Sequence, residues 1–199
     1  MEKTVFPTQP QQAAPTPLDH RRDALLTAAR MLVALNDIGR SFGPDARVSV
    51  GRLIPETDGP STIVGGVRFV IDLRHPDAAV LADLSSQCAA TCRAIATADG
   101  CDIALSERIS VAPKHFDPDC IAALAAAARD LGFSHSEIAS GALHDASNIV
   151  DVAPTAMIFV PCRDGISHNV SEYASREDLA AGTSVLLQAM LAKAGLAGP

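Results

Sequence analysis

The chain of 199 residues is 48% hydrophobic and 20% charged, a composition typical of globular proteins with one large domain or two small ones. Its net charge of −7 comes without a basic run, which argues against a nucleic-acid partner. The N-terminal residues show no apolar stretch of signal-peptide length, and no apolar run is long enough to cross a bilayer. We therefore expect a cytoplasmic protein that binds neither nucleic acid nor membrane and acts on a small substrate.

The five cysteines are an odd number and lack the spacing of a disulfide framework, so we expect reduced thiols. Cys88 and Cys92 are four residues apart on a predicted helix and would share one of its faces. They could form half of a metal site or lie as thiols in the core. The lack of a second pair favours the core interpretation.

The first part of the chain predicts alternating strands and helices. Apolar residues at helical spacing indicate a helix over 19–40, and Pro76 is placed to open a second helix that buries Val80, Leu84, Cys88 and Ile95. Period-two alternation indicates strands over 47–53, 62–73 and 102–111, and a short strand is expected over 3–6. The order β-α-β-β-α-β predicts a ferredoxin-like, α+β domain with both helices on one face of an antiparallel sheet.

Prolines and charges over 112–118 interrupt this pattern and predict a domain boundary, which gives domains 1–112 and 113–199. The elements expected beyond it are helices over 119–131, 145–150 and 176–194, and strands over 135–139 and 156–160. A two-stranded sheet is marginal by itself. Either another chain supplies further strands, or the unit associates through its exposed strand edge.

Two histidines stand in predicted loops that flank the apolar strand 156–160. His144 precedes the strand, and His168 follows it with Asn169 and Glu172 nearby. Loops at strand ends are where α/β sheets place ligands, and a neutral imidazole there can bind a metal or polarise a carbonyl. Each histidine taken singly is also explained as a structural residue with satisfied hydrogen bonds.

Three motifs make the sequence recognisable. They are Gly165-Ile166-Ser167-His168-Asn169 with the following Glu172-Tyr173 and Glu177-Asp178-Leu179, the stretch 140–146, and Val70-Ile71-Asp72-Leu73-Arg74-His75-Pro76. Together they resemble the N-carbamoyl-L-amino-acid hydrolase, β-alanine synthase and allantoate amidohydrolase branch of the M20-type dinuclear metallohydrolases. The resemblance runs from about Ala13 to Ala194. It implies an α/β catalytic domain interrupted by a ferredoxin-like dimerisation domain. Residues 113–199 would be the C-terminal portion of the catalytic domain.

The resemblance also implies roles for three residues. His168 resembles the last ligand of one of two divalent metals, and an imidazole suits zinc, manganese, cobalt or nickel. His144 resembles the histidine that contacts substrate beside the metals. Arg74 resembles the arginine that fixes the substrate carboxylate, a task suited to a planar, two-pronged donor. For Arg74 a surface salt bridge at a strand end is the alternative.

The chain also departs from the family pattern. The family's earlier ligands and its glutamate general base have no counterpart, so no catalytic residue is assigned in this chain, and the metal site is expected to be incomplete. Gln12 stands where the family has a histidine that crosses the dimer to stabilise the oxyanion. Ser61 replaces a substrate-binding asparagine, and Leu143 replaces the glycine before His144.

These observations predict a partial, split or truncated, metal-dependent amidohydrolase that cleaves the C–N bond of carbamoyl or ureido amino acids or allantoate-like substrates. It would be inactive without the missing N-terminal half. Its expected partner is a second copy, bound through the ferredoxin-like domain, or a chain supplying that half. A non-catalytic dimerisation or binding module derived from the family is the alternative, and a free-standing hydrolase or a gene fragment are further ones.

Overall fold

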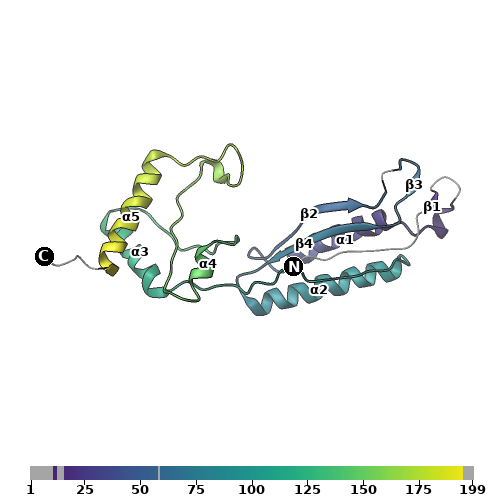
Figure 1. The fold of residues 1–199 in the computed structure, drawn as a ribbon, viewed down its shortest axis with the longest axis horizontal. Coiled ribbons are helices and arrows are strands. Elements are labelled where there is room, and N and C mark those ends of the chain that lie inside the picture. Colours follow the sequence, from purple (N-terminus) through teal and green to yellow (C-terminus); the bar gives the residue numbers. More distant parts are fainter. Residues whose placement is uncertain (1–10, 13–15, 58, 195–199) are drawn as a thin grey trace. The chain divides into compact units, whose positions relative to one another are not determined.

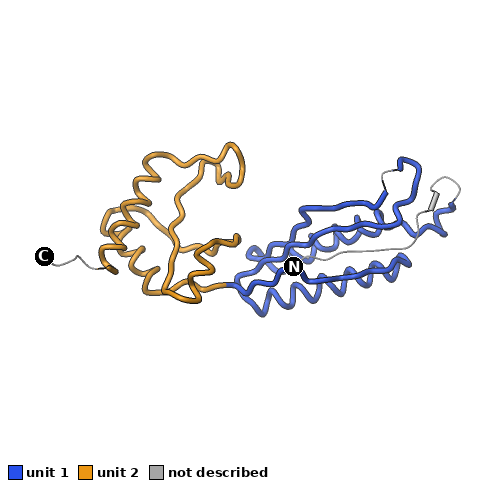
Figure 2. Tube along the Cα trace, in the orientation of Figure 1, with its two compact units in different colours: residues 1–113 blue, residues 114–199 orange. Residues whose placement is uncertain are grey.

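The computed structural model describes residues 11–12, 16–57 and 59–194. The chain divides into two compact units, Met1–Pro113 and Lys114–Pro199, which are coloured separately in Figure 2. Within the described ranges, no helix combines the length and the apolar character needed to span a membrane.

The first unit packs two long helices against a β-hairpin. Helix α1 (Ala24–Ser41) is followed by β2 (Arg47–Pro55), β4 (Val67–Arg74) and α2 (Ala78–Ala98) (Figure 1). Strands β2 and β4 are antiparallel, from Arg47 opposite Arg74 to Pro55 opposite Val67. Alternate β4 residues are buried against α1 and α2: Val67, Phe69, Ile71 and Leu73. Both helices therefore cover the same face of the hairpin, as the sequence predicted.

Aspartates cap both helices. Asp23 accepts hydrogen bonds from the N–H groups of Leu25 and Leu26 at 3.0 and 3.1 Å, and Asp77 caps α2 in the same way. Pro76 therefore lies one residue before the N-cap of α2. The prediction that Pro76 stands in the first turn of this helix was wrong, because the helix begins at Ala78. An aspartate side chain can satisfy the free N–H groups of a first turn, which proline cannot do.

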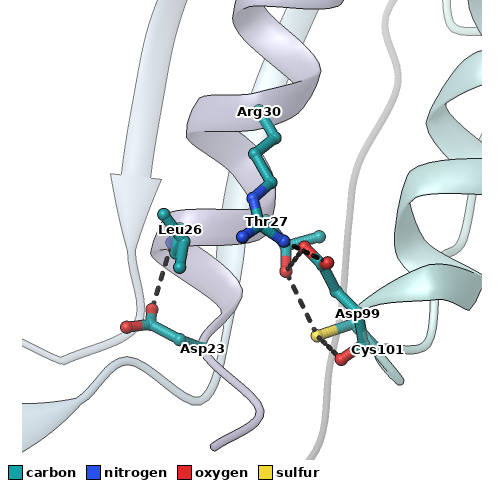
Figure 3. A network of polar contacts seen from close by, with 6 residues as sticks. All are labelled: Asp23, Leu26, Thr27, Arg30, Asp99 and Cys101. Carbon is teal, nitrogen blue, oxygen red and sulfur yellow. Dashed lines mark hydrogen bonds and ion pairs between the residues drawn. The ribbon is translucent and has the colours of Figure 1, made fainter. Parts of the chain in front are cut away.

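A polar network joins the start of α1 to the end of α2 (Figure 3). Thr27, which is 1% exposed, donates from Oγ1 to Asp99 Oδ2 at 2.8 Å, and Arg30 forms an ion pair with the same carboxylate. Cys101 Sγ lies 3.5 Å from the Thr27 hydroxyl. Because Asp99 is the C-cap residue of α2, these contacts fix how the two helices are aligned on the hairpin.

The predicted strand 62–73 is interrupted. Its first residues form β3 (Thr62–Ile63), which pairs with β1 (Gln11–Gln12) in a separate two-stranded sheet. Gly66 separates β3 from β4, and a Cβ there would lie 2.0 Å from Glu56 Oε2. The Glu56 side chain would have to move to admit a Cβ at Gly66, and the chain changes sheet at this turn.

The ferredoxin-like prediction is only partly matched. Its central α-β-β-α order is present, but the strand expected over 102–111 is wrong, because only Ala104 makes an isolated bridge within it. Ile103 packs against the core, but Ile109 and Val111 are 64% and 44% exposed, so the second half of the segment has no surface to pack against. The strand expected over 3–6 lies outside the described residues. The structure supports a mixed α/β unit with a small antiparallel sheet.

The second unit is held together by two helices. Helix α3 (Pro118–Asp130) packs against α5 (Arg176–Ala194) through Ala127, Ala128, Val185 and Ala189. The short helix α4 (Ala146–Ile149) and a 3-10 turn, η2 (Arg163–Gly165), lie between them in sequence. All three helices were predicted at nearly these positions.

The strands predicted over 135–139 and 156–160 were wrong, since the described residues of this unit include no β-strand. A strand is defined by the backbone hydrogen bonds that it makes to a neighbour, and apolar composition alone does not supply them. Residues 156–160 instead run between the helices as an unpaired apolar segment, tied at its start by the Asp117 N–H, which donates to Thr155 O at 2.9 Å.

Candidate functional site

Arg74 ends β4 and is bound to Asp72 on the same strand. Its Nε lies 3.1 Å from both Asp72 oxygens, and its Nη2 lies 2.5 Å from Oδ2. The hydrogen bonds from Arg74 lower the pKa of the Asp72 carboxyl, and the same bonds raise the pKa of Arg74. The two side chains are 44% and 41% exposed, which makes this a surface ion pair. The salt bridge considered as the alternative for Arg74 is therefore present.

His144 is oriented by two contacts. Its Nε2 lies 2.6 Å from Ser140 Oγ, which also accepts a hydrogen bond from Ala142 N–H at 3.2 Å. The imidazole ring meets the Phe159 ring edge-on, with the ring centroids 5.5 Å apart and the planes at 61°. A single serine hydroxyl thus stabilises the loop and holds one ring nitrogen, because it accepts from the backbone and shares a second hydrogen bond with Nε2.

His168 has an uncommon backbone conformation. Its φ is +57°, in the left-handed region. Its N–H donates to Glu172 Oε2 at 2.7 Å, and the Glu172 N–H donates to Asn169 O at 3.0 Å. Asn169 Oδ1 accepts from the N–H and the hydroxyl of Ser171. The turn 168–172 is therefore closed by its own side chains, and His168 is exposed on it.

A second contact closes the wider loop that carries His168. The Arg163 N–H donates to Tyr173 O at 2.8 Å, and the Arg163 guanidinium lies over the Tyr173 ring, 5.2 Å from its centroid. A cavity of about 240 Å³ lies beside this contact, lined by Pro161, Cys162, Arg163, Tyr173, Ser175 and Asp178. Sequence reasoning gave no role to Arg163 or to Ser140, because both contacts depend on loop geometry.

Two of the residues that depart from the family pattern, Gln12 and Ser61, lie in the first unit. Gln12 in β1 pairs with Thr62, the residue after Ser61. Arg74 is at the far end of β4, an eight-residue strand on the order of 25 Å long. Within this unit the structure thus does not bring Arg74 near Gln12 or Ser61. Leu143 is 66% exposed beside His144.

The described residues do not by themselves form a metal site. Among them, no group of three or more histidine, cysteine, aspartate or glutamate side chains is placed to hold a metal ion. Cys88 and Cys92 are fully buried in the first unit, which supports their interpretation as core thiols. His168 therefore stands as a single candidate ligand.

Comparisons with known proteins identify the family. The model of peptidase family M20/M25/M40 matches residues 13–192, and the chain belongs to this family. It is 36% identical over 176 residues to the N-carbamoyl-L-amino-acid amidohydrolase of Rhizobium meliloti, a match that covers 88% of this chain and 42% of the relative. It is 32% identical to the allantoate amidohydrolase of Bacillus subtilis, over 87% of this chain and 42% of the relative.

A solved structure shows the same relationship. The amidase of the hydantoinase/carbamoylase family from Burkholderia vietnamiensis superimposes with a TM-score of 0.90 at 44% identity, over 96% of this chain and 46% of that chain. The predicted resemblance to the carbamoylase and allantoate amidohydrolase branch is confirmed. The chain spans less than half the length of these relatives. Membership of the family supports a divalent metal ion as the cofactor.

Proposed function

We propose that this chain forms part of a metal-dependent amidohydrolase that cleaves the C–N bond of a carbamoyl or ureido amino acid or an allantoate-like substrate. The observation that carries the proposal is its similarity, along most of its length, both to an N-carbamoyl-L-amino-acid amidohydrolase and to an allantoate amidohydrolase. Arg74, His144 and His168 are the residues assigned to substrate and metal. The general base and the other metal ligands would come from the part of the family's fold that this chain does not match.

The geometry of Arg74 supports its assignment to a substrate carboxylate. Its guanidinium already contacts both oxygens of one carboxylate, that of Asp72, and the pair remains partly exposed to solvent. Because an exposed ion pair is worth at most about 1 kcal/mol, a substrate carboxylate can compete with Asp72 for the same donors. Carbamoyl amino acids, ureido acids and allantoate all carry such a group.

The proposal gives the two histidines different tasks. His144 Nε2 is engaged by Ser140, which leaves the ring oriented in its loop for a substrate contact. His168 projects from a turn whose backbone is fixed by Glu172, and its exposed position suits a ligand to zinc, manganese, cobalt or nickel. Since the described residues hold no group of three or more possible ligands, a metal at His168 would need ligands from outside the described residues.

The test is hydrolysis of N-carbamoyl amino acids and allantoate, measured by the release of ammonia and of the product. The full chain is assayed alone and co-expressed with the remaining portion of the Rhizobium meliloti relative. We expect turnover only in the second case. Arg74→Ala should raise the KM at least tenfold and Arg74→Lys should raise it less, since lysine keeps the positive charge but lacks the two-pronged geometry of the guanidinium. Absence of turnover with every substrate, in a preparation shown to contain the complex, would contradict the proposal.

A non-catalytic dimerisation or binding module is the alternative, motivated by Gln12 and Ser61. The named relatives are hydrolases, so the comparisons do not favour it. Light scattering separates this alternative from the proposal only in combination with the assay: a stable dimer that never gains turnover would favour a binding module.

A further inference from the structure

The β2–β4 hairpin has one face that α1 and α2 leave uncovered. Both helices pack against alternate residues of the two strands, and the side chains between those residues point to the opposite side. We call that side the open face. Its members are Arg47, Ser49, Arg52 and Ile54 of β2, and Arg68, Val70, Asp72 and Arg74 of β4.

The open face is positively charged although the chain as a whole carries a net charge of −7. Every charged residue of β2 and β4 lies on this face. They are Arg47, Arg52, Arg68 and Arg74, with Asp72 as the one carboxylate. Asp72 is already bound to Arg74. A surface with such an excess of cations attracts anions from solution.

Arg47 lies directly opposite Arg74 in the register of the hairpin. The Cα atoms of directly opposite residues in an antiparallel pair are about 4.5–5.5 Å apart, and their side chains share a face. Like charges in that relation oppose strand pairing. A local arrangement that opposes folding is typical of a functional position, and an anion held between the two cations would relieve the repulsion.

The Arg47 guanidinium is anchored at one corner. Its Nη1 donates to the carbonyl oxygens of Pro44 and Ala46, the latter at 3.0 Å. Among the described residues it forms no ion pair, and its hydrogen bonds use Nη1 alone. The edge formed by Nε and Nη2 therefore makes no hydrogen bond to them. Two parallel donors of this kind match the two oxygens of a carboxylate.

We propose that Arg47 binds a second carboxylate of the substrate, so that the preferred substrates are N-carbamoyl or ureido derivatives of a dicarboxylic amino acid. The inference rests on the proposed function, in which Arg74 binds the first carboxylate. The α-carboxylate and the side-chain carboxylate of an N-carbamoyl-aspartate would each meet one arginine. A substrate with a single carboxylate leaves Arg47 without an anion, and this difference is what makes the site selective.

A purely structural role is the competing explanation for Arg47. Its bonds to Pro44 and Ala46 hold the turn that leads into β2, and no ligand is needed for that. Loss of such a role would weaken the hairpin and the binding of every ligand alike. Selectivity between two ligands of the same shape and different charge therefore separates the two explanations.

The test titrates the full chain with N-carbamoyl-L-aspartate and with N-carbamoyl-L-asparagine, followed by NMR of the amides in residues 47–49 and 72–74. The asparagine derivative has nearly the same shape but lacks the second negative charge. We expect a Kd at least about tenfold lower for the aspartate derivative. Arg47→Ala should remove this preference and leave the Kd of the asparagine derivative nearly unchanged, and Arg47→Lys should keep part of the preference.

Arg52→Ala is the matched control. It removes the same charge from the same face, but Arg52 lies opposite Val70, which is four residues along β4 from Arg74 and thus on the order of 13 Å away. The preference should stay within about twofold of that of the unmodified chain. The amide spectra and urea unfolding of each variant show whether the first unit is folded.

Three results would overturn the proposal. The first is a failure of the aspartate derivative to bind in the millimolar range. The second is an equal loss of preference in Arg47→Ala and Arg52→Ala, which would indicate general attraction to a cationic face. The third is a weakening of both ligands alike in Arg47→Ala, which would indicate a structural role.

The same two compounds, tested as substrates of the complex with the remaining portion of the Rhizobium meliloti relative, separate this inference from the proposed function. We expect a higher kcat/KM for the aspartate derivative, lost in Arg47→Ala. Hydrolysis without that preference keeps the proposed function and overturns this inference. Binding to the chain that depends on Arg47, with no hydrolysis by the complex, keeps the dicarboxylate site and removes the proposed function.

Discussion

The backbone N–H of His168 donates to Glu172 Oε2 at 2.7 Å, and this bond spans the turn that holds His168 at φ +57°. A non-glycine residue in the left-handed region is disfavoured by roughly 1–2 kcal/mol, so the surrounding turn must stabilise it. Glu172 therefore has a structural task that its place in the sequence motif does not reveal.

We expect Glu172→Ala to loosen this turn, and Glu172→Gln to leave it nearly intact because an amide oxygen can still accept the bond. Loss of about 1 kcal/mol corresponds to roughly fivefold faster exchange of the His168 amide hydrogen. Hydrogen exchange followed by NMR measures this directly. Identical exchange rates in Glu172→Ala and the unmodified chain would show that the bond does not hold the turn.

The Asp72–Arg74 pair predicts a small dependence of stability on pH. Because the pKa of Asp72 is lowered in the folded protein, its contribution is present above the unfolded pKa of about 3.9 and is lost as pH falls through the lower, folded value. Both side chains are more than a third exposed, so the contribution is below about 1 kcal/mol. Urea unfolding of Asp72→Asn should match the unmodified chain in acid and fall slightly below it at pH 7. A variant equally destabilised at both pH values would contradict this account.

The network of Thr27 and Asp99 predicts a larger effect on the first unit. Thr27→Val keeps the shape of the side chain but removes the hydrogen bond to a mostly buried carboxylate, and we expect a loss of about 1–2 kcal/mol. Arg30 is 55% exposed, so Arg30→Ala should lose less, about 0.5 kcal/mol. Urea denaturation followed by circular dichroism compares the two. The reverse order of effects would show that the ion pair dominates.

The buried cysteines predict slow thiol chemistry. Cys88 and Cys92 are 0% exposed, whereas Cys162 is partly exposed in the second unit. A thiol reagent should label Cys162 at least about tenfold faster than either core cysteine in the native protein, and all at similar rates in urea. Mass spectrometry of the labelled peptides measures the labelling rate of each cysteine. Fast labelling of Cys88 would show that the packing around α2 is not as tight as the structure indicates.

Local patterns in the sequence predicted the helices better than the strands. The apolar spacing of α1, α2 and α3 lies within each helix, so no other part of the chain is needed to recognise it. The segments 102–111, 135–139 and 156–160 have apolar or alternating residues, but a strand also needs a neighbour. No local pattern supplies that neighbour.

The candidate site shows the same limit. The motifs located Arg74, His144 and His168 by position, but the partners Ser140 and Glu172 follow from loop geometry that spacing alone does not give. The Asp72–Arg74 pair could have been predicted, because residues two apart on a strand share a face. Asp72 was nevertheless not recognised as the partner of Arg74.

The most direct test of amidohydrolase function is metal content measured together with turnover. The full chain is purified with the remaining portion of the Rhizobium meliloti relative, and metal is counted by plasma mass spectrometry in the unmodified complex and in His168→Ala. The account predicts that His168→Ala lowers both the metal stoichiometry and the hydrolysis of N-carbamoyl amino acids, while the complex still forms. Unchanged metal content and unchanged turnover in His168→Ala would contradict it.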